Sequence, residues 1–164
     1  MTEPLACKFM RSPVRRLKLV ASDRGLVAIL WDADEKAKRI TLPASEKRNR
    51  HPVLVKAERQ LKEYFAGRRK RFSLKLDLRG TPFQNKVWRA LLKIPFGETR
   101  TYGEIARQLG HPSAARAVGA ANGKNPISII APCHRLIGSN GKLHGYAGGL
   151  KTKADLLKHE DARR

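Results

Sequence analysis

The period of the hydrophobic pattern changes at Gly80, and this change constrains the fold more than any other feature of the sequence. Before it, apolar and polar residues alternate over residues 14–42 and again over residues 72–78, which is typical of short strands. The segment from His51 to Gly67 repeats its apolar residues at helical spacing. The pattern predicts an α+β fold, in which residues 1–78 form an N-terminal α/β unit on a short antiparallel sheet.

The second half, residues 79–164, begins its helices with capping boxes. In a capping box a Thr side chain and a side chain three residues later satisfy each other's backbone N–H groups. Three such boxes predict helix starts, at Thr81–Gln84, Thr101–Glu104 and Thr152–Asp155. The first of these helices is expected to run to a stop at Pro95. This half is therefore expected to be a mainly helical domain.

The chain is strongly basic, with 35 Lys and Arg against 14 Asp and Glu and a formal charge of +21. Such a charge makes a polyanion the first partner to consider, and a solvated surface without a specific partner is the alternative. The basic runs at 47–50 and 68–71 are expected to be solvated loops, with a localisation signal as the alternative. No apolar stretch has the length of a membrane span or a signal sequence, so we expect no membrane contact and a cytoplasmic protein.

The chain has two cysteines, Cys7 and Cys133. Two are too few for a disulfide framework or for a four-ligand zinc site, so we expect neither a bound metal nor a cofactor. A reducing compartment fits this composition.

Residues 101–121 have the pattern of a helix-turn-helix. A first helix is expected from Thr101 to about Leu109, and a second from Ser113 after a turn. The first residues of the second helix lie nearest the bases in such a motif, and Arg116 falls at the third helical position. The other residues of this helix are mostly Ala and Gly, which suits either close approach to a DNA groove or tight packing of two helices inside the protein.

The segment Pro132–Arg135 follows an apolar run over residues 125–131 that should be buried. A lone buried cysteine is usually only a small hydrophobe. Here, however, His134 can accept the thiol proton and Arg135 can stabilise a thiolate, so Cys133 is a candidate nucleophile. Adjacent residues of an extended segment point opposite ways, so a bridging water is expected to join thiol and imidazole unless the chain turns.

A base that activates a nucleophile needs a third group to orient it, and Glu160 is the candidate. Its helix is expected to start at Thr152, so that Glu160 shares a side with Leu156 and Leu157 and points toward the core. An exposed position near the chain end is the alternative. The glycine-rich loop over residues 138–149 is expected to wall a pocket, and a plain flexible loop is the alternative.

Taken together, these segments resemble the O6-alkylguanine-DNA alkyltransferase family, over roughly residues 78–160. The similarity lies in the spacing and content of five blocks: Ala114–Gly119, Asn125-Pro126, Pro132–Arg135, Gly145–Gly149 and Leu156–Glu160. The resemblance implies a helix-turn-helix that enters the minor groove and flips a nucleotide. It also implies irreversible, single-turnover transfer of an alkyl group from O6-alkylguanine, and also from O4-alkylthymine, to a cysteine of the protein. The expected partner is double-stranded DNA containing alkylated guanine, bound by a protein that is a monomer without DNA.

The resemblance also assigns roles by position. Cys133 resembles the alkyl acceptor, His134 the water-linked base and Glu160 the carboxylate that orients this base. Asn125 resembles the residue that holds the segment in place. Tyr102 resembles the tyrosine that helps to rotate the base and donates a proton to it.

Arg116 resembles the residue that fills the gap left by a flipped nucleotide. Further DNA contacts are expected from Tyr102, Ala115, Ala117 and Gly119, and the substrate pocket is expected to be lined by Tyr146, Ala147, Gly148, Arg135 and Lys153. Many family members have a serine where this chain has Ala147. The backbone N–H of Ala147 is therefore expected to replace a hydroxyl contact, with an altered substrate preference.

Three other functions compete with alkyl transfer. A lesion sensor of the alkyltransferase-like type lacks the acceptor cysteine, which this chain has at Cys133. A plain helix-turn-helix regulator would not need the group of Cys, His and Glu side chains. A cysteine hydrolase forms a thioester that water can attack, whereas the thioether formed by alkyl transfer has no carbonyl group.

Overall fold

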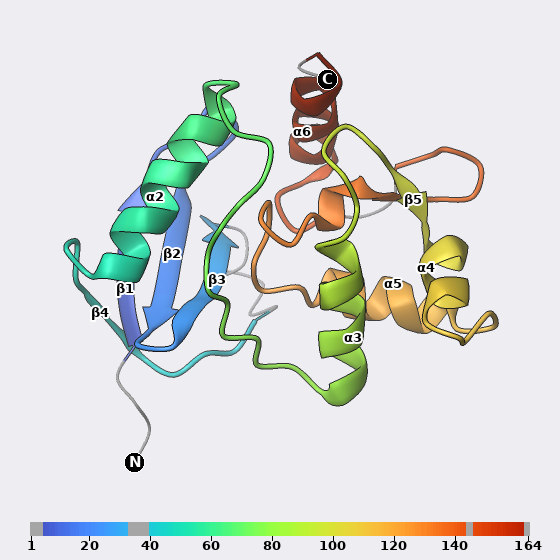
Figure 1. The fold of residues 1–164 in the computed structure, drawn as a ribbon, viewed down its shortest axis with the longest axis horizontal. Helices are drawn as coiled ribbons and strands as arrows, with labels where there is room; N and C mark the ends of the chain where they lie inside the picture. Colours follow the sequence, from blue (N-terminus) through green and yellow to red (C-terminus); the bar gives the residue numbers. More distant parts are fainter. Residues whose placement is uncertain (1–4, 33–39, 144–145, 163–164) are drawn as a thin grey trace. The chain divides into compact units, whose positions relative to one another are not determined.

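The computed structural model describes residues 5–32, 40–143 and 146–162 of the chain. The fold is α+β, as predicted. The chain divides into two compact units, residues 1–79 and 80–164, so the division lies one residue beyond the predicted boundary. The first unit contains a sheet and the helix α2, and the second contains mainly short helices (Figure 1).

The sheet of the first unit has four strands in the order β3-β2-β1-β4. Strands β1 (Leu5–Met10), β2 (Leu17–Ser22) and β3 (Gly25–Trp31) pair antiparallel, and the hairpin of β2 and β3 falls within the predicted region. Strand β4 (Ser45–Lys47) pairs parallel with β1. The predicted antiparallel pairing is confirmed for three strands, and β4 makes the sheet mixed. Alternation shows which face of a strand is buried and not the direction of its partner, so the parallel strand could not be predicted.

Helix α2 (Pro52–Phe65) confirms the predicted helix and packs against β1, β2 and β3. Its first turn is capped by His51, whose Nδ1 accepts a hydrogen bond from the N–H of Val53 at 3.2 Å. Proline suits the first helical position because its missing N–H would have no partner there. The side that faces the sheet buries Leu54, Ala57, Leu61 and Tyr64, each 0% exposed. The opposite side of α2 faces solvent.

Residues 72–78 were predicted to be a strand, and this prediction was wrong. The segment makes a single bridge to the sheet, between Leu26 and Leu76. Two backbone hydrogen bonds join it to β3, from the N–H of Leu26 to the Lys75 carbonyl at 2.9 Å and from the N–H of Asp77 to the Leu26 carbonyl at 2.8 Å. The side chain of Gln60 holds the start of the segment, since it accepts from the N–H of Ser73 at 2.9 Å and donates back to the Ser73 carbonyl at 3.3 Å. The leucines alternate because one side of the segment is buried. One side can be buried without the hydrogen-bond ladder of a strand.

The second unit is mainly helical and contains the helix-turn-helix, as predicted. Two short parallel strands also lie in it, β5 (Arg100–Thr101) and β6 (Leu136–Ile137). Its helices are α3 (Pro82–Leu91), α4 (Tyr102–Gln108), α5 (Ala115–Gly123), the 3-10 turn η1 (Cys133–Arg135) and α6 (Leu150–Ala162).

Two of the three capping boxes are confirmed. Thr81 and Gln84 cap α3, and Thr101 and Glu104 cap α4, with both reciprocal bonds present in each case. The third was wrong, because α6 begins at Leu150 and its first turn already contains the proposed cap. Helix α3 also ends earlier than predicted, at Leu91, because a proline disfavours helical geometry in the residue before it.

Candidate active site

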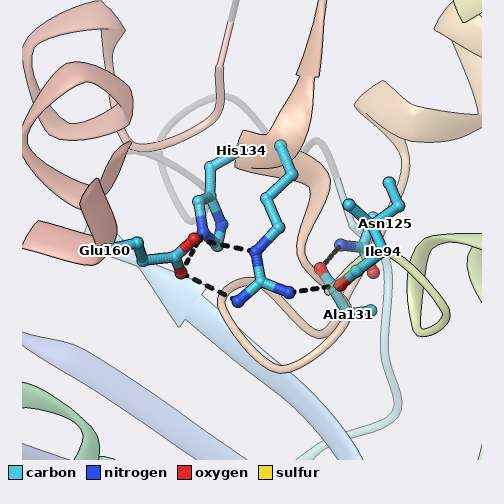
Figure 2. A network of polar contacts seen from close by, with 6 residues as sticks. Ile94, Asn125, Ala131, His134 and Glu160 are labelled. Carbon is cyan, nitrogen blue, oxygen red and sulfur yellow. Dashed lines mark hydrogen bonds and ion pairs between the residues drawn. The ribbon is translucent and has the colours of Figure 1, made fainter. Parts of the chain in front are cut away.

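The segment before the candidate nucleophile is braced by Asn125. Its Nδ2 donates to the carbonyl of Ala131 at 2.8 Å (Figure 2), and its Oδ1 accepts from the N–H of Ile127 at 3.1 Å. The segment is buried from residue 125 to residue 136, as predicted, but it turns instead of extending. Ile129 has a φ of 73°, in the left-handed region that a β-branched residue adopts only with strain. The amide of Asn125 therefore holds a strained turn closed.

Cys133, His134 and Arg135 form the turn η1, so of the two geometries that the sequence left open the chain adopts the turn. Successive side chains of a 3-10 helix are rotated by about 120°, because the helix has three residues per turn. The three side chains therefore leave the backbone in different directions. All three are buried, with 5%, 0% and 6% exposure respectively.

A buried network joins η1 to α6 through Glu160, which is 1% exposed (Figure 2). The Nε2 atom of His134 lies 2.7 Å from Oε2 of Glu160. Arg135 donates from Nε to Oε1 at 2.8 Å and from Nη2 to Oε2 at 2.9 Å. Its third donor, Nη1, reaches the carbonyl of Ile94 at 2.6 Å. The expectation that Glu160 points into the core is confirmed, although α6 starts two residues earlier than predicted.

The network fixes the charge states of Glu160 and His134. Burial alone would raise the pKa of Glu160, but hydrogen bonds and positive charge from His134 and Arg135 outweigh it and hold the pKa far below its ordinary value. Burial lowers the pKa of His134 below its usual 6.5, despite the nearby carboxylate. At neutral pH the site therefore contains an ionised Glu160, a positive Arg135 and a neutral imidazole.

A neutral imidazole has one N–H and one lone pair, and the network decides where each lies. Glu160 can only accept, so the proton of His134 belongs on Nε2. The lone pair then lies on Nδ1, which is buried and has no hydrogen-bond partner among the residues that the structure describes. His134 is therefore arranged to take up a proton at Nδ1.

Two further ionisable side chains interact electrostatically with Cys133. Lys153 on α6 is 0% exposed, and burial lowers its pKa while the charge of Cys133 opposes this shift. Tyr102, the first residue of α4, has a raised pKa because of burial and of Cys133. A phenol with a raised pKa keeps its proton at neutral pH and can donate it.

The position of Lys153 could be read from the sequence by spacing alone. It precedes Glu160 by seven residues, which is two helical turns, so both lie on the same face of α6. This face offers a cation toward Cys133 and an anion toward His134. Arg135, in contrast, was expected to line the substrate pocket, but its guanidinium is directed at Glu160 and at a backbone carbonyl.

The helix-turn-helix consists of α4 and α5, which contact each other. Arg116 is exposed, but it is the second residue of α5 rather than the third, because Ala114 is the cap and the helix begins at Ala115. The cap residue Ala114 provides no side-chain hydrogen bond, so the first N–H groups of α5 keep their capacity to bind an anion.

The small residues of α5 are divided between the surface and the packing with neighbouring helices. Ala117 is exposed, and Ala115 is partly buried. Gly119 faces the ring of Tyr102, where an added Cβ would lie 3.7 Å from Cδ1. Ala121 is buried, and its carbonyl accepts a hydrogen bond of 2.8 Å from Nε1 of Trp88 on α3.

Residues 144 and 145 in the loop before α6 lie outside the described residues, and residue 145 is the first of the block Gly145–Gly149. Tyr146 and Ala147 are partly buried and Gly148 is buried. Gly149 has a φ of 94° and donates its N–H to the carbonyl of Tyr146 at 2.9 Å. A glycine is required there because other residues rarely adopt this backbone geometry. That the loop walls the substrate pocket stays a prediction.

A hollow that the sequence did not predict lies beside Glu160, the network residue on α6. It has a volume of about 480 Å³ and is lined by Gly97, Glu98, Thr99, Arg100, Leu157, Glu160 and Asp161. None of the residues around the thiol lines it, so it is not the expected substrate pocket.

Fold and site together define a class of protein. The second unit combines a helix-turn-helix with a buried cysteine whose histidine neighbour is oriented by a carboxylate. This is the combination expected of a DNA-binding domain that also holds a candidate nucleophile.

Sequence profiles of known families identify that class more closely. Residues 5–78 match the ribonuclease-like domain of 6-O-methylguanine DNA methyltransferase, and residues 82–162 match its DNA-binding domain. The chain belongs to the 6-O-methylguanine DNA methyltransferase family, which confirms the resemblance seen in the sequence.

Individual relatives agree with this. A methylated-DNA–protein-cysteine methyltransferase of Methanosarcina acetivorans is 51% identical over 149 residues, 91% of this chain and 94% of that protein. One of Mycobacterium tuberculosis is 64% identical over 104 residues, 63% of each chain. The crystal structure of Mycobacterium tuberculosis OGT in complex with DNA has 46% sequence identity and a TM-score of 0.87, and covers 96% of this chain and 94% of that one.

Neither a membrane span nor a metal site is found in the described residues. None of their helices is both long and apolar enough to cross a membrane. No group of three or more His, Cys, Asp or Glu side chains among them is placed to hold a metal ion.

Proposed function

We propose that this chain repairs DNA by moving the alkyl group of O6-alkylguanine, and also of O4-alkylthymine, onto Cys133. The observation that carries this proposal is the order of the buried groups. The cysteine precedes a histidine whose Nε2 is held by Glu160 at 2.7 Å and whose Nδ1 has no hydrogen-bond partner among the described residues. Membership of a family named for DNA methyl transfer supports the class of reaction.

The thiol is activated by His134. A water molecule bridges the thiol and Nδ1, and the thiol proton passes through it to the imidazole, which then carries a positive charge. Glu160 stabilises this charge because it is ionised and lies at hydrogen-bond distance. Lys153 favours the resulting thiolate through its own positive charge.

The alkyl group is transferred in one displacement. The Cys133 thiolate attacks the alkyl carbon, a carbon–sulfur bond forms, and the carbon–oxygen bond breaks with its electron pair left on the base. Tyr102 donates a proton to the base, which its raised pKa allows. The product is a thioether, which has no carbonyl for water to attack, so each molecule acts once.

The base reaches the thiol by leaving the DNA stack. Unstacking costs a few kcal/mol and least for a damaged pair, which contributes to selectivity. The exposed Arg116 at the start of α5 fills the vacated space from the minor groove, with Ala115, Ala117 and Gly119 allowing close approach. Tyr146, Ala147 and Gly148 line the pocket, where the N–H of Ala147 contacts the guanine oxygen.

A monomer is sufficient for this reaction, and we place it in the cytoplasm. The helix-turn-helix and all of the proposed reacting side chains belong to one unit of one chain, residues 80–164. No second copy is needed to complete the site.

Intact-mass measurement tests the proposal directly. The protein is incubated with a duplex that contains O6-methylguanine, and a gain equal to one methyl group is expected, with the modified peptide containing Cys133. Cys133→Ser should bind the same duplex without gaining mass. A lesion sensor or a DNA-binding regulator would bind without any gain. Methylation of the Cys133→Ser variant, or at Cys7 instead, would overturn the assignment.

A further inference from the structure

The first unit contains a concentration of positive charge that alkyl transfer does not use. Residues 47–71 contain ten Lys and Arg against two Glu, a net charge of +8 within 25 residues. A net charge of about 2–8 is enough to keep a whole small domain soluble. This one segment therefore carries as much net charge as the upper end of the range for a whole domain.

The structure places these cations along and around the solvent side of α2. Lys56, Arg59 and Lys62 are exposed and recur every three residues, so they follow one another along the helix opposite its buried stripe. The segments at its two ends add exposed arginines. We call the set the α2 basic surface: Arg48, Arg50, Lys56, Arg59, Lys62, Arg68 and Arg71.

The only two carboxylates of α2 are neutralised by neighbouring cations. Oε1 of Glu58 lies 3.2 Å from Nζ of Lys8 and 3.5 Å from Nζ of Lys62. Oε1 of Glu63 lies 3.1 Å from Nε of Arg69. The outward side of α2 therefore presents positive charge without a compensating anion of its own.

Six cations of the surface make no ion pair within the described part of the chain: Arg48, Arg50, Lys56, Arg59, Arg68 and Arg71. Like charges three and four residues apart destabilise a helix by about 0.2–0.5 kcal/mol per pair. An external anion would relieve this repulsion.

The dimensions and chemistry of the surface fit a nucleic-acid backbone. A helix of 14 residues is about 21 Å long, and one DNA strand places a phosphate about every 3.4 Å along the axis, so α2 matches about six phosphates. Arginine, which makes up five of the seven cations, binds phosphate with two parallel N–H donors.

We propose that the α2 basic surface is a second DNA-contact surface, which binds the phosphates of duplex DNA without reading sequence. Its role is to add salt-dependent, non-specific affinity, through which the protein stays on undamaged DNA while it searches for a lesion. The proposal rests on the proposed function only in taking DNA as the partner. It is independent of the chemistry at Cys133.

Salt dependence of binding to undamaged duplex DNA tests this, with two variants that lose equal charge. The first variant is Lys56→Gln, Arg59→Gln and Arg68→Gln, on the α2 basic surface. The second is a control, Arg11→Gln, Arg15→Gln and Lys75→Gln, at exposed positions elsewhere in the first unit. Affinity is measured from about 50 to 200 mM salt, the range in which phosphate contacts are lost.

Each phosphate contact contributes about 0.9 to the slope of log affinity against log salt. The first variant should therefore lose about 2–3 units of slope, and the control less than about 1. Equal losses in both variants would mean that only net charge matters, and an unchanged slope in the first variant would mean that the surface does not touch DNA. Either result overturns the proposal.

A second readout separates this proposal from the proposed function. Transfer from free O6-alkylguanine base needs no DNA contact, so both variants should match the parent. If the parent itself transfers nothing, the proposed function fails while the comparison of slopes remains valid. Should the first variant lose its fold by circular dichroism, Arg59→Gln alone decides, with a loss of about 0.9 expected and no loss contradicting the proposal.

Discussion

At the scale of single residues, the carboxylate of Glu160 determines what the imidazole can do. The carboxylate accepts hydrogen bonds from both Arg135 and His134. The proton of His134 therefore stays on Nε2 and the lone pair on Nδ1. Glu160→Gln keeps the size of the side chain but removes its charge. Transfer at neutral pH should slow on the order of 10²-fold, the lower end of what general-base catalysis contributes.

The same substitution should also destabilise the fold, because it leaves the Arg135 charge buried without its partner, which costs about 3–5 kcal/mol. Single-turnover rates and denaturant unfolding measure the two effects separately. Asp161→Asn is the matched control, since that carboxylate is exposed and adjacent in sequence. Equal rates for parent and Glu160→Gln across the pH range would remove Glu160 from the mechanism.

The pH dependence of transfer should reflect the imidazole. The base must be neutral, and burial lowers the pKa of His134 below its usual 6.5, so protonation begins to inhibit only at more acidic pH. At pH 6.5 and above, imidazole protonation should therefore not inhibit transfer. Below pH 6.5 the transfer rate should decrease. Single-turnover rates on free alkylated base between about pH 5 and 8 avoid the pH dependence of DNA binding. A loss of half the rate near pH 7 on acidification would contradict this.

At the scale of elements, the proposed function assigns DNA contact, and not the alkyl transfer itself, to α5. Arg116 is exposed at its start, and the residues around it are too small to fill a vacated stack. Arg116→Ala should slow repair in duplex DNA, where unstacking costs a few kcal/mol. It should leave transfer from free base nearly unchanged.

The control for Arg116 is Arg107→Ala, an exposed arginine on the neighbouring helix α4. Removing an ordinary phosphate contact lowers affinity and reduces the salt slope by about one unit. Arg107→Ala should do no more than this. If Arg116→Ala behaves in the same way, Arg116 is a phosphate contact, and equal loss on duplex and free base would assign it to the chemistry.

Elements were predictable from the sequence where the determinants are local. The capping boxes at Thr81 and Thr101 involve four consecutive residues, and both helices start as predicted. Residues 72–78 and 125–131 show the opposite case, because their apolar pattern reports burial but not backbone geometry. Side-chain bonds from Gln60 and Asn125 set the paths of these segments, and such long-range bonds leave no periodic signal.

The part of the site that lies in two short segments was predictable from the sequence. Cys133, His134 and Glu160 were identified from neighbouring residues and helical spacing, and the structure brings the last two together. The third bond of Arg135, to the carbonyl of Ile94, could not be predicted because a carbonyl has no sequence signature. Lys153 was named from the family resemblance alone, although its spacing from Glu160 also places both residues on one face of α6.

At the scale of the whole molecule, charge and buried groups act together on stability. The chain has a formal charge of +21 at neutral pH, so further protonation adds to its self-repulsion. The surface acids of α2 offset part of this through ion pairs with Lys8, Lys62 and Arg69. Lowering the pH therefore has two destabilising effects. It breaks these ion pairs by protonating the carboxylates, and it increases the net positive charge of the chain.

The free energy of unfolding should consequently fall as the pH is lowered from 7. His134 has a lowered pKa in the fold, so the unfolded chain binds a proton first as the pH falls through 6.5, and stability begins to decline there. Glu160 also has a lowered pKa, so the stability from its ionised form is complete above its usual 4.5 and is lost as the pH falls below that value. Urea unfolding at constant ionic strength, at about pH 7.5, 5 and 3, measures both steps. Glu160→Gln should be less stable than the parent at the highest pH but should lose less on acidification, because the second step is absent. A parent protein with the same unfolding free energy at all three pH values would show that neither group is held in its buried state by the fold.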